Sequence, residues 1–160
     1  MLKDWNKVEQ PTAEEVDKRL ANAKNSLLQQ QIAMKEKKLP VIVLLEGWGA
    51  AGKGSVLGKL IKNIDPRFFK VAVMDEPTEE EKRKPFLYRH FVKIPEAGKF
   101  VFMDSGWMSE VTSQKLSGEL SEEEYKKRIE SIKRFERQLT DNGYLLLKFF
   151  FNIDKKEQKK

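Results

Sequence analysis

Four short apolar runs alternate with helix-like stretches along this chain, and this alternation is the strongest constraint on its fold. The runs are residues 41–47 (VIVLLEG), 68–74 (FFKVAVM), 99–104 (KFVFMD) and 144–153 (YLLLKFFFNI). The first run is unbroken apolar sequence, which is typical of a strand covered on both faces of a parallel sheet. Strands that alternate with helices predict a parallel sheet between two helical layers, a three-layer α/β/α fold.

The stretches between the runs carry helix signals. Thr12 and Glu15 match a capping box, and Ser121 and Glu124 match a second one before a long helix that Gly143 should end. We expect a helix over 53–64 as well, with Val56 among its inward residues, and a short one from Thr78. Residues 105–120 are predicted to form a loop, and 154–160 to begin a further helix. In the first helix, apolar residues recur at helical spacing and predict a buried face: Val16, Leu20, Ala23, Leu27 and Met34.

Length and composition fit one globular domain, 1–160, whose residues 1–39 form a helical N-terminal extension. The net charge of +6 and the sequence pI of about 9.4 suit an anionic partner: nucleic acid, nucleotides or a phosphate polymer. A solvated Lys/Glu surface accounts for most of the same charges. The chain has no cysteine and His90 is its sole histidine, which argues against disulfides and a zinc site. It has no membrane-length apolar run and no signal peptide, so a cytoplasmic location is the expectation.

The segment EGWGAAGKGS, residues 46–55, joins the first strand to the next helix and resembles a Walker A phosphate loop. Gly47, Gly52 and Lys53 fit the pattern, whereas Gly54 stands where Ser or Thr is usual and Ser55 follows one position later. Glycines let consecutive backbone amides turn toward one anion, and the lysine adds a mobile positive charge. The residues expected to bind phosphate here are Gly47, Gly49, Ala50, Ala51, Gly52, Lys53, Gly54 and Ser55.

Asp104 ends the third apolar run. In P-loop folds an acid at the end of another central strand holds Mg²⁺, so we expect Asp104 to be the metal ligand, with Lys53 and Asp104 as the catalytic pair. The alternative for Asp104 is a turn or helix cap at a strand end.

Beyond the loop, consecutive blocks of the chain resemble the polyphosphate kinase 2 family. The blocks are GWGAAGKG, DPRFFKV, EPTEEEKRKPFLYRHFVKIPEAGKFVFMDSGWMSE and FERQLTDNGYLLLKFFFNIDKKEQ, and they cover the chain from about residue 12 onward. The resemblance implies a P-loop NTPase-like α/β/α fold, a Mg²⁺ cofactor, and inorganic polyphosphate and a nucleotide (AMP or ADP) as partners. We expect neither a nucleic acid nor a membrane as partner, and the basic surface and long helices are compatible with a family-like homo-oligomer.

The sequence departs from the active family pattern at two positions. Gly49 stands where the loop carries an aspartate, and Ser105 stands where an arginine follows the strand-end aspartate. Losing one strong electrostatic contact to a transition state costs about 2.7–4 kcal/mol of barrier, so two losses would leave little catalysis. Members that use AMP as acceptor are similar to two fused copies of the domain, the first degenerate at both positions. The chain resembles that N-terminal copy, part of a longer protein, and it lacks the basic lid segment that follows the last strand.

Two further arginines match family positions. Arg67 and Arg89 are candidates for the phosphate channel, although Arg67 is equally well a solvated turn residue. Trp107 follows the strand end and either walls the acceptor site or packs against the loop. His90 is expected to be a packed residue, Trp48 to support the loop, and residues 148–151 to be a core strand.

Three functions remain open at this point. The first is a polyphosphate-dependent nucleotide phosphotransferase domain, weak or silent by itself. The second is a non-catalytic polyphosphate-binding domain that supports a catalytic partner domain. The third is a nucleoside monophosphate kinase that uses ATP, which Ser55 after Gly54 allows.

Overall fold

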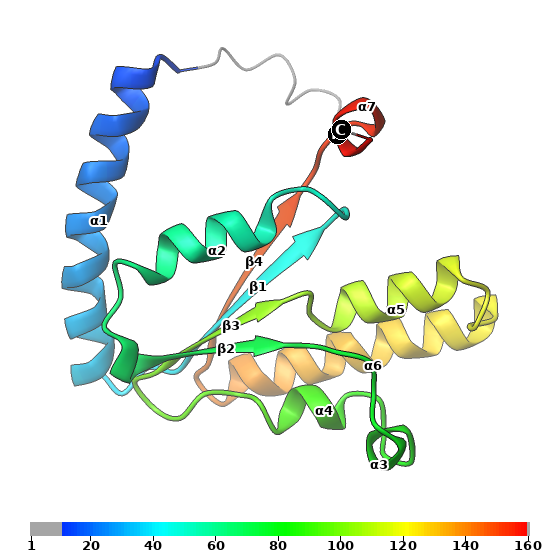
Figure 1. Cartoon of the computed structure of the whole chain (residues 1–160). Helices are drawn as coiled ribbons and strands as arrows, with labels where there is room; N and C mark the ends of the chain where they lie inside the picture. The colour runs from blue at the N-terminus through cyan, green and yellow to red at the C-terminus, as the bar shows by residue number, and fades with distance from the viewer. Residues whose placement is uncertain (1–10, 160) are drawn as a thin grey trace.

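The structure is a computed structural model that describes residues 11–159, so the first ten residues of the predicted N-terminal extension lie outside the described residues. Its centre is a parallel sheet in the order β2-β3-β1-β4 (Figure 1). The strands are β1 Val41–Gly47, β2 Phe69–Val73, β3 Phe100–Asp104 and β4 Leu145–Phe151. The predicted parallel sheet is confirmed, and all four predicted strands are present.

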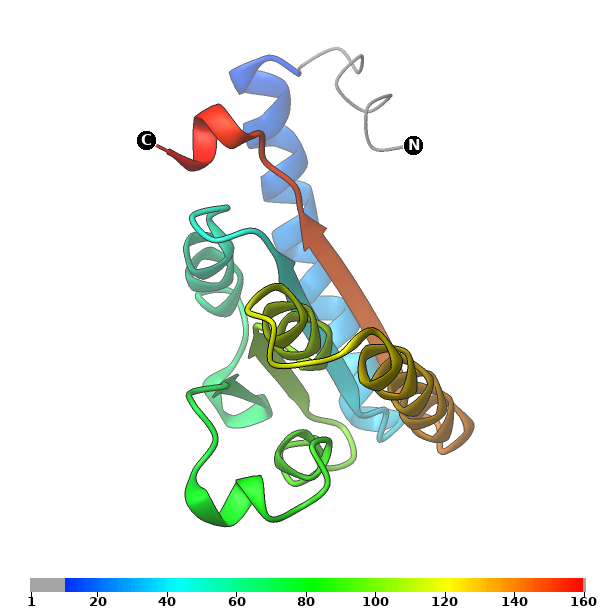
Figure 2. The same ribbon diagram turned by 90° about the vertical axis from the view of Figure 1, so that its right-hand side faces the viewer.

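Helices connect and cover the strands (Figures 1 and 2). The long ones are α1 Ala13–Glu36, α2 Lys53–Ile61, α5 Trp107–Leu116 and α6 Glu122–Asp141. The short ones are η2 Pro66–Phe68, a 3₁₀ turn, and α3 Glu79–Lys82, α4 Tyr88–Phe91 and α7 Lys155–Gln158. Capping boxes at Thr12, Thr78 and Ser121 start α1, α3 and α6, as their side chains predict.

The two faces of the sheet form two separate cores. On one face Val43, Leu45 and Phe102 pack with Leu57 of α2 and Met34 of α1. On the other face the alternate strand residues pack against α5 and α6, through Ile42, Leu44, Val101, Met103, Trp107, Val111, Ile132, Phe135 and Leu139. Residues 41–46 are buried without interruption, so β1 is the central strand that its unbroken apolar run predicts. The three-layer α/β/α prediction is confirmed.

The predicted loop over 105–120 is wrong, because residues 107–116 form α5. The segment is rich in Ser and Thr, and its N-cap Gly106 supplies no capping side chain. Its helix is stabilised by tertiary packing, since Trp107 and Val111, one turn apart, are both fully buried under the sheet.

The prediction of β4 as a core strand is also wrong. β4 lies at the edge of the sheet, and Phe149 and Phe150 are 50% and 56% exposed.

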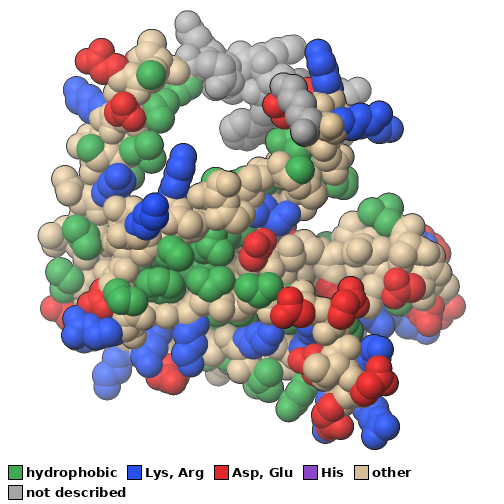
Figure 3. All heavy atoms as spheres, in the orientation of Figure 1, with side chains coloured by type: hydrophobic (Ala, Val, Ile, Leu, Met, Phe, Trp, Pro, Cys, Tyr) green, Lys and Arg blue, Asp and Glu red, His purple; other side chains and the backbone are tan. Residues whose placement is uncertain are grey.

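The apolar face predicted for the first helix is covered only toward its C-terminal end: Met34 is buried, whereas Val16 and Leu20 are exposed. Val56 of α2 is exposed as well, so the inward placement predicted for it is wrong, and Val71 and Val73 of β2 are also exposed. Figure 3 shows a group of hydrophobic side chains near the middle of this face of the molecule.

Candidate functional site

The predicted phosphate loop, residues 47–52, lies at the carboxyl end of β1, in the middle of the sheet. In open α/β sheets, ligands bind at the carboxyl ends of the strands, between two neighbouring strands whose following connections lead to opposite sides of the sheet. Here the connection after β1 leads to β2, and the connection after the neighbouring strand β3 leads to β4 on the other side. Ala50 and Gly52 have positive φ angles of 63° and 83°, so the chain reverses its curvature twice before α2 begins. Such alternation turns successive backbone amides toward one concave side.

Several of these amides are free to bind an anion. Within residues 11–159, the backbone amides of Gly49, Ala50, Gly52 and Lys53 donate to no protein acceptor. The Ala51 amide closes the turn by donating to the Trp48 carbonyl at 3.2 Å. The amino end of α2 faces the same space and adds its positive dipole end.

Gly47 is required by a close approach between backbones. A Cβ atom at residue 47 would lie 2.3 Å from the Phe151 carbonyl oxygen and 2.8 Å from the Phe151 nitrogen. The Trp48 amide donates to the same carbonyl at 3.3 Å. The end of β4 therefore holds the loop in place from the side opposite β3.

The Lys53 ammonium group lies over the loop. It donates to the Gly47 carbonyl at 3.3 Å and to the Trp48 carbonyl at 3.1 Å. Both acceptors are neutral and the side chain is half-buried at the loop, so the charge is available to an anion that enters beside the free amides.

Asp104 lies on the same face of the sheet as α2. The register pairs Asp104 with Leu45, so its side chain shares the face on which Leu45 and Phe102 pack against Leu57. Lys53 begins the same helix α2, and the carboxylate and the ammonium therefore lie on one side of the sheet. Ser105 follows in a left-handed conformation with φ 64° and donates its amide to the Leu45 carbonyl at 3.2 Å, which closes the strand end.

Glu46 is a site residue that the sequence predictions missed. It is 7% exposed, points to the face opposite Asp104, and accepts a hydrogen bond from the Ser109 hydroxyl of α5. Its Oε1 atom is buried, without a partner in residues 11–159 and 2.8 Å from where a Cβ on Gly106 would lie. Glu46 thus connects the residue before the phosphate loop to the turn after Asp104. A single acid at the end of an otherwise apolar strand was the available signal.

The structure does not bring Arg67 to the loop. Arg67 lies just before β2, at the amino end of the strands, whereas the loop lies at their carboxyl end. Its guanidinium donates to both carboxylate oxygens of Asp65 at 2.6–3.1 Å. These hydrogen bonds lower the pKa of Asp65 to about 2. The geometry of Arg67 therefore fits the alternative that it is a solvated turn residue.

Arg89 and His90 are buried in α4 and contact α5 rather than the loop. One Arg89 nitrogen donates to the Asp75 carbonyl, another lies 3.9 Å from the Glu110 carboxylate, and His90 Nε2 lies 3.0 Å from the same group. Arg89 therefore has the carboxylate partner that a buried guanidinium requires. His90 packs edge-on against Trp107, which is fully buried and so belongs to the core instead of the acceptor site.

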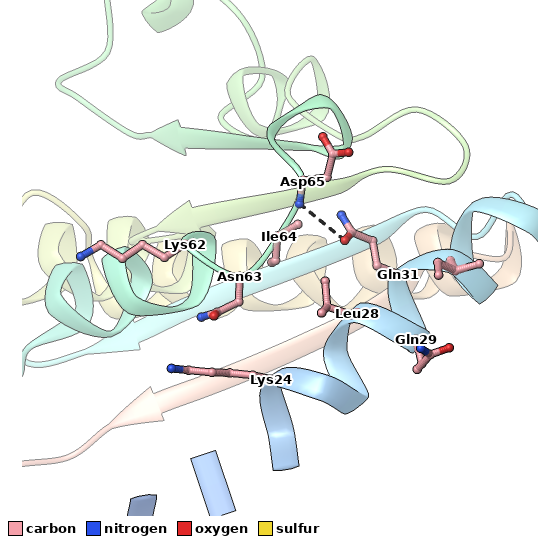
Figure 4. Close-up of a pocket in the computed structure, with 9 residues that line it drawn as sticks. Lys24, Leu28, Gln29, Gln31, Lys62, Asn63, Ile64 and Asp65 are labelled. Atoms are coloured by element: carbon pink, nitrogen blue, oxygen red, sulfur yellow. Dashed lines mark hydrogen bonds between the residues drawn. The ribbon is translucent and has the colours of Figure 1, made fainter. Parts of the chain in front are cut away.

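A groove of about 700 Å³ lies elsewhere, between α1 and the segment that joins α2 to β2 (Figure 4). Lys24, Leu28 and Gln31 of α1 line one side, and residues 62–65 line the other. The Asp65 amide donates to Gln31 Oε1 at 3.5 Å across it. No residue of the phosphate loop lines this groove, so it is separate from the candidate site.

Two absences are relevant within the described residues. No helix in 11–159 is both long and apolar enough to span a bilayer. The same part of the chain contains no cluster of three or more His, Cys, Asp or Glu side chains arranged to hold a metal.

Comparison with known proteins agrees with this architecture. The family described as Polyphosphate kinase 2 (PPK2) matches residues 10–160. The chain is 30% identical over 141 residues to an ADP-polyphosphate phosphotransferase 3 of Rhizobium meliloti, covering 88% of this chain and 50% of that protein. It is 34% identical over 122 residues to a Polyphosphate:AMP phosphotransferase of Pseudomonas syringae pv. tomato, covering 76% of this chain and 24% of that protein.

A solved structure extends the comparison to three dimensions. The crystal structure of a putative polyphosphate kinase 2 from Pseudomonas aeruginosa PA01 superposes with a TM-score of 0.90 at 29% identity, over 98% of this chain and 34% of that one. The chain thus spans half or less of the length of these relatives. The family match covers nearly every residue and the fold agrees with it, so this chain belongs to the polyphosphate kinase 2 family.

Proposed function

We propose that this chain is a phosphate-binding domain of a polyphosphate:nucleotide phosphotransferase, and that it transfers phosphoryl groups weakly or not at all by itself. The observation that carries the proposal is a set of free loop amides beside the Lys53 ammonium, on the same face of the sheet as Asp104. These amides belong to Gly49, Ala50, Gly52 and Lys53. The relatives act on polyphosphate and nucleotides, as their names state. Their greater length supports a second, homologous domain in the full protein.

Lys53 and the loop amides would orient and neutralise the phosphate oxygens in an in-line transfer, which needs no covalent nucleophile. Asp104 fits Mg²⁺, since this ion commonly takes one or two carboxylates and completes its shell with water and substrate phosphates. When bound there, the ion would neutralise charge on the transferring group. Glu46 points to the opposite face of the sheet, where one of its oxygens accepts from Ser109. Within residues 41–47 and 100–104, Asp104 is therefore the acid on the same face as Lys53.

Replacing Lys53 by alanine is expected to weaken binding of polyphosphate. A hydrogen bond to a charged group contributes about 1.5–3 kcal/mol, so the dissociation constant should rise about 10- to 100-fold. Titration calorimetry with a short polyphosphate at fixed magnesium measures the change. Lys59→Ala, an exposed lysine of the same helix α2, removes the same charge outside the loop and should change the constant by less than about threefold. Equal effects of the two substitutions would show that general positive charge, and not the loop, binds the polymer.

Restoring the two missing groups is expected to raise phosphoryl transfer. Gly49→Asp fits sterically, because a Cβ there would meet only Gln158 Nε2 at 3.9 Å, and the φ of Gly49 is not in the left-handed region. Ser105→Arg keeps a non-glycine residue at φ 64°, a conformation that Ser105 already adopts. With polyphosphate, Mg²⁺ and AMP or ADP, the unaltered chain should show negligible turnover, and the double variant at least about tenfold more, since each group is worth a hundredfold or more in active sites.

The control for that assay is Lys53→Ala in the double-variant background, which should remove the gain. Strong turnover by the unaltered chain that Lys53→Ala abolishes would refute the proposal that the domain is weak or silent alone. Polyphosphate binding without turnover in every variant would favour a supporting role for a catalytic partner domain. Turnover that needs ATP and ignores polyphosphate would favour the nucleoside monophosphate kinase alternative.

A further inference from the structure

The outer edge of β4 is open in the described part of the chain. β4 pairs with β1 on one side, and within residues 11–159 no strand pairs with it on the other. The Leu145 amide donates to the Pro40 carbonyl at 3.0 Å, so Leu145 and every second residue after it turn their backbone groups toward β1. The backbone groups of the alternate residues therefore face the open edge. These residues are Leu146, Lys148 and Phe150.

β4 also lacks the features that normally prevent an edge strand from pairing. Such strands are usually short, charged, interrupted by proline or covered by another element. β4 is seven residues long without proline, and the ammonium of its one charged residue, Lys148, is held by Glu136 at 2.7 Å. The opposite edge differs, because β2 is five residues long, contains Lys70, and has its Val73 carbonyl occupied by the Lys93 ammonium at 3.1 Å. The edge of the sheet that is open to pairing is therefore β4.

Apolar side chains accompany the free backbone groups. Three of them lie on one face of β4 and are 41%, 37% and 50% exposed: Leu145, Leu147 and Phe149. The register with β1 places them on the face of the sheet that α1 and α2 cover farther inward. Figure 2 shows β4 running along one margin of the sheet. A strand added at this margin would bond the free backbone groups and cover these side chains at the same time.

A second copy of β4 is such a strand. If a two-fold axis passes through Leu147, antiparallel pairing sets Leu145 of one copy opposite Phe149 of the other. It also sets Leu146 opposite Lys148, and both of these residues have outward backbone groups that can exchange hydrogen bonds. An axis through Lys148 would instead set two lysines opposite each other, which is unfavourable. The register centred on Leu147 pairs apolar side chains with one another and keeps the lysines apart.

We propose that β4 is the interface through which two copies of this chain form a two-fold symmetric dimer with one continuous sheet. The self-complementary register is the reason for a second copy in preference to a different protein. The interface requires no bound phosphate, so this inference is independent of the proposed function. It lies next to the loop without using the loop amides, because the Phe151 carbonyl at the end of β4 accepts from the Trp48 amide.

Light scattering coupled to size-exclusion chromatography measures the mass of the whole chain in solution. We expect twice the mass of one chain at about 100 µM and dissociation near about 1 µM, as for a small interface of moderate affinity. Leu147→Lys puts two charges on the two-fold axis and should give a monomer even at the higher concentration. Val71→Lys is the matched control, since Val71 is 39% exposed on the other edge strand, β2, and should leave the dimer intact.

Cysteine cross-linking tests the register, because the chain has no cysteine of its own. In Leu147→Cys the two sulfurs meet at a non-hydrogen-bonded pair whose Cα atoms lie about 4.5 Å apart, within disulfide range. Non-reducing electrophoresis after mild oxidation should therefore show a covalent dimer. In the control, Leu145→Cys, the equivalent Cα atoms are four residues out of step and about 13 Å apart, so no disulfide should form.

Each of the other outcomes would overturn the proposal. A chain that stays monomeric up to about 1 mM would refute the dimer and leave the β4 edge to a strand from another part of a longer protein. A dimer that persists in folded Leu147→Lys would place the interface elsewhere on the molecule. If circular dichroism shows that Leu147→Lys does not fold, the cross-link decides, and a folded, dimeric Leu147→Cys without a disulfide would refute the pairing. A disulfide in Leu145→Cys alone would refute the register.

Discussion

Gly47→Ala is expected to lower the free energy of unfolding by about 3 kcal/mol, because overpacking and a strained backbone each cost about 1–3 kcal/mol. The added methyl carbon would lie 2.3 Å from the Phe151 carbonyl oxygen and 3.0 Å from the Phe151 carbonyl carbon. These are backbone atoms in the ladder between β1 and β4, so they cannot move as the end of a side chain can. The φ of 138° at Gly47 also lies in a region that alanine avoids.

Urea denaturation followed by circular dichroism measures this loss, and Gly58→Ala is the matched control. Gly58 lies inside α2, where an added Cβ meets nothing within 4 Å and φ is not positive. Alanine there should stabilise the protein by about 0.4–1 kcal/mol, because it reduces the freedom of the unfolded chain and favours helix. Equal stability of the two variants would mean that β4 does not approach the loop as closely as the structure places it. The Gly47 variant should also bind polyphosphate more weakly, since the displaced segment supports the free amides.

Trp107→Ala is expected to cost about 3–5 kcal/mol of stability, the usual range for removing a buried tryptophan. The side chain is fully buried and packs edge-on against Phe135 at a centroid distance of 5.2 Å. Its Nε1 donates to Glu136 Oε1 at 2.9 Å, and the other oxygen of Glu136 accepts from the Lys148 ammonium at 2.7 Å. Alanine would therefore leave a cavity beneath the sheet and remove a partner from a half-buried carboxylate.

Thermal and urea unfolding measure the effect, with Leu116→Ala as the control on the same helix. Leu116 is 76% exposed, so its truncation should change stability by less than about 0.5 kcal/mol. In the fraction of Trp107→Ala that remains folded, polyphosphate affinity should stay within about threefold of the unaltered chain, because Trp107 lies in the core. A stable Trp107→Ala variant with lost binding would instead place this residue at the acceptor site.

Local signals in the sequence were sufficient for most of the elements. Thr12, Thr78 and Ser121 start helices because their hydroxyls accept backbone hydrogen bonds within three residues, an interaction that depends on neighbouring residues alone. The β1 run likewise predicted a buried strand, and the glycines that follow it predicted a tight turn at its end. Phosphate binding by that turn stays a prediction. The family resemblance followed from the order of these same segments.

The placement of charged and aromatic side chains could not be predicted in the same way. Arg89 and Glu110 are 21 positions apart, and only the packing of α4 beside α5 brings them within 3.9 Å. The partner of Glu46 is Ser109, on a helix that the sequence did not predict, because α5 is stabilised by what it buries and lacks an N-terminal capping side chain.

The sequence by itself therefore determined the alternating α/β architecture, the helix caps and the glycine-rich turn after β1, since each depends on contacts between residues close in the chain or on a repeated pattern of hydrophobicity. The tertiary structure alone decided that β4 is an edge strand, that Trp107 is buried while Trp48 is exposed, and that Asp104 shares a face with Lys53. These outcomes depend on which strands pair and which helix covers which face, and long-range packing energies set those choices.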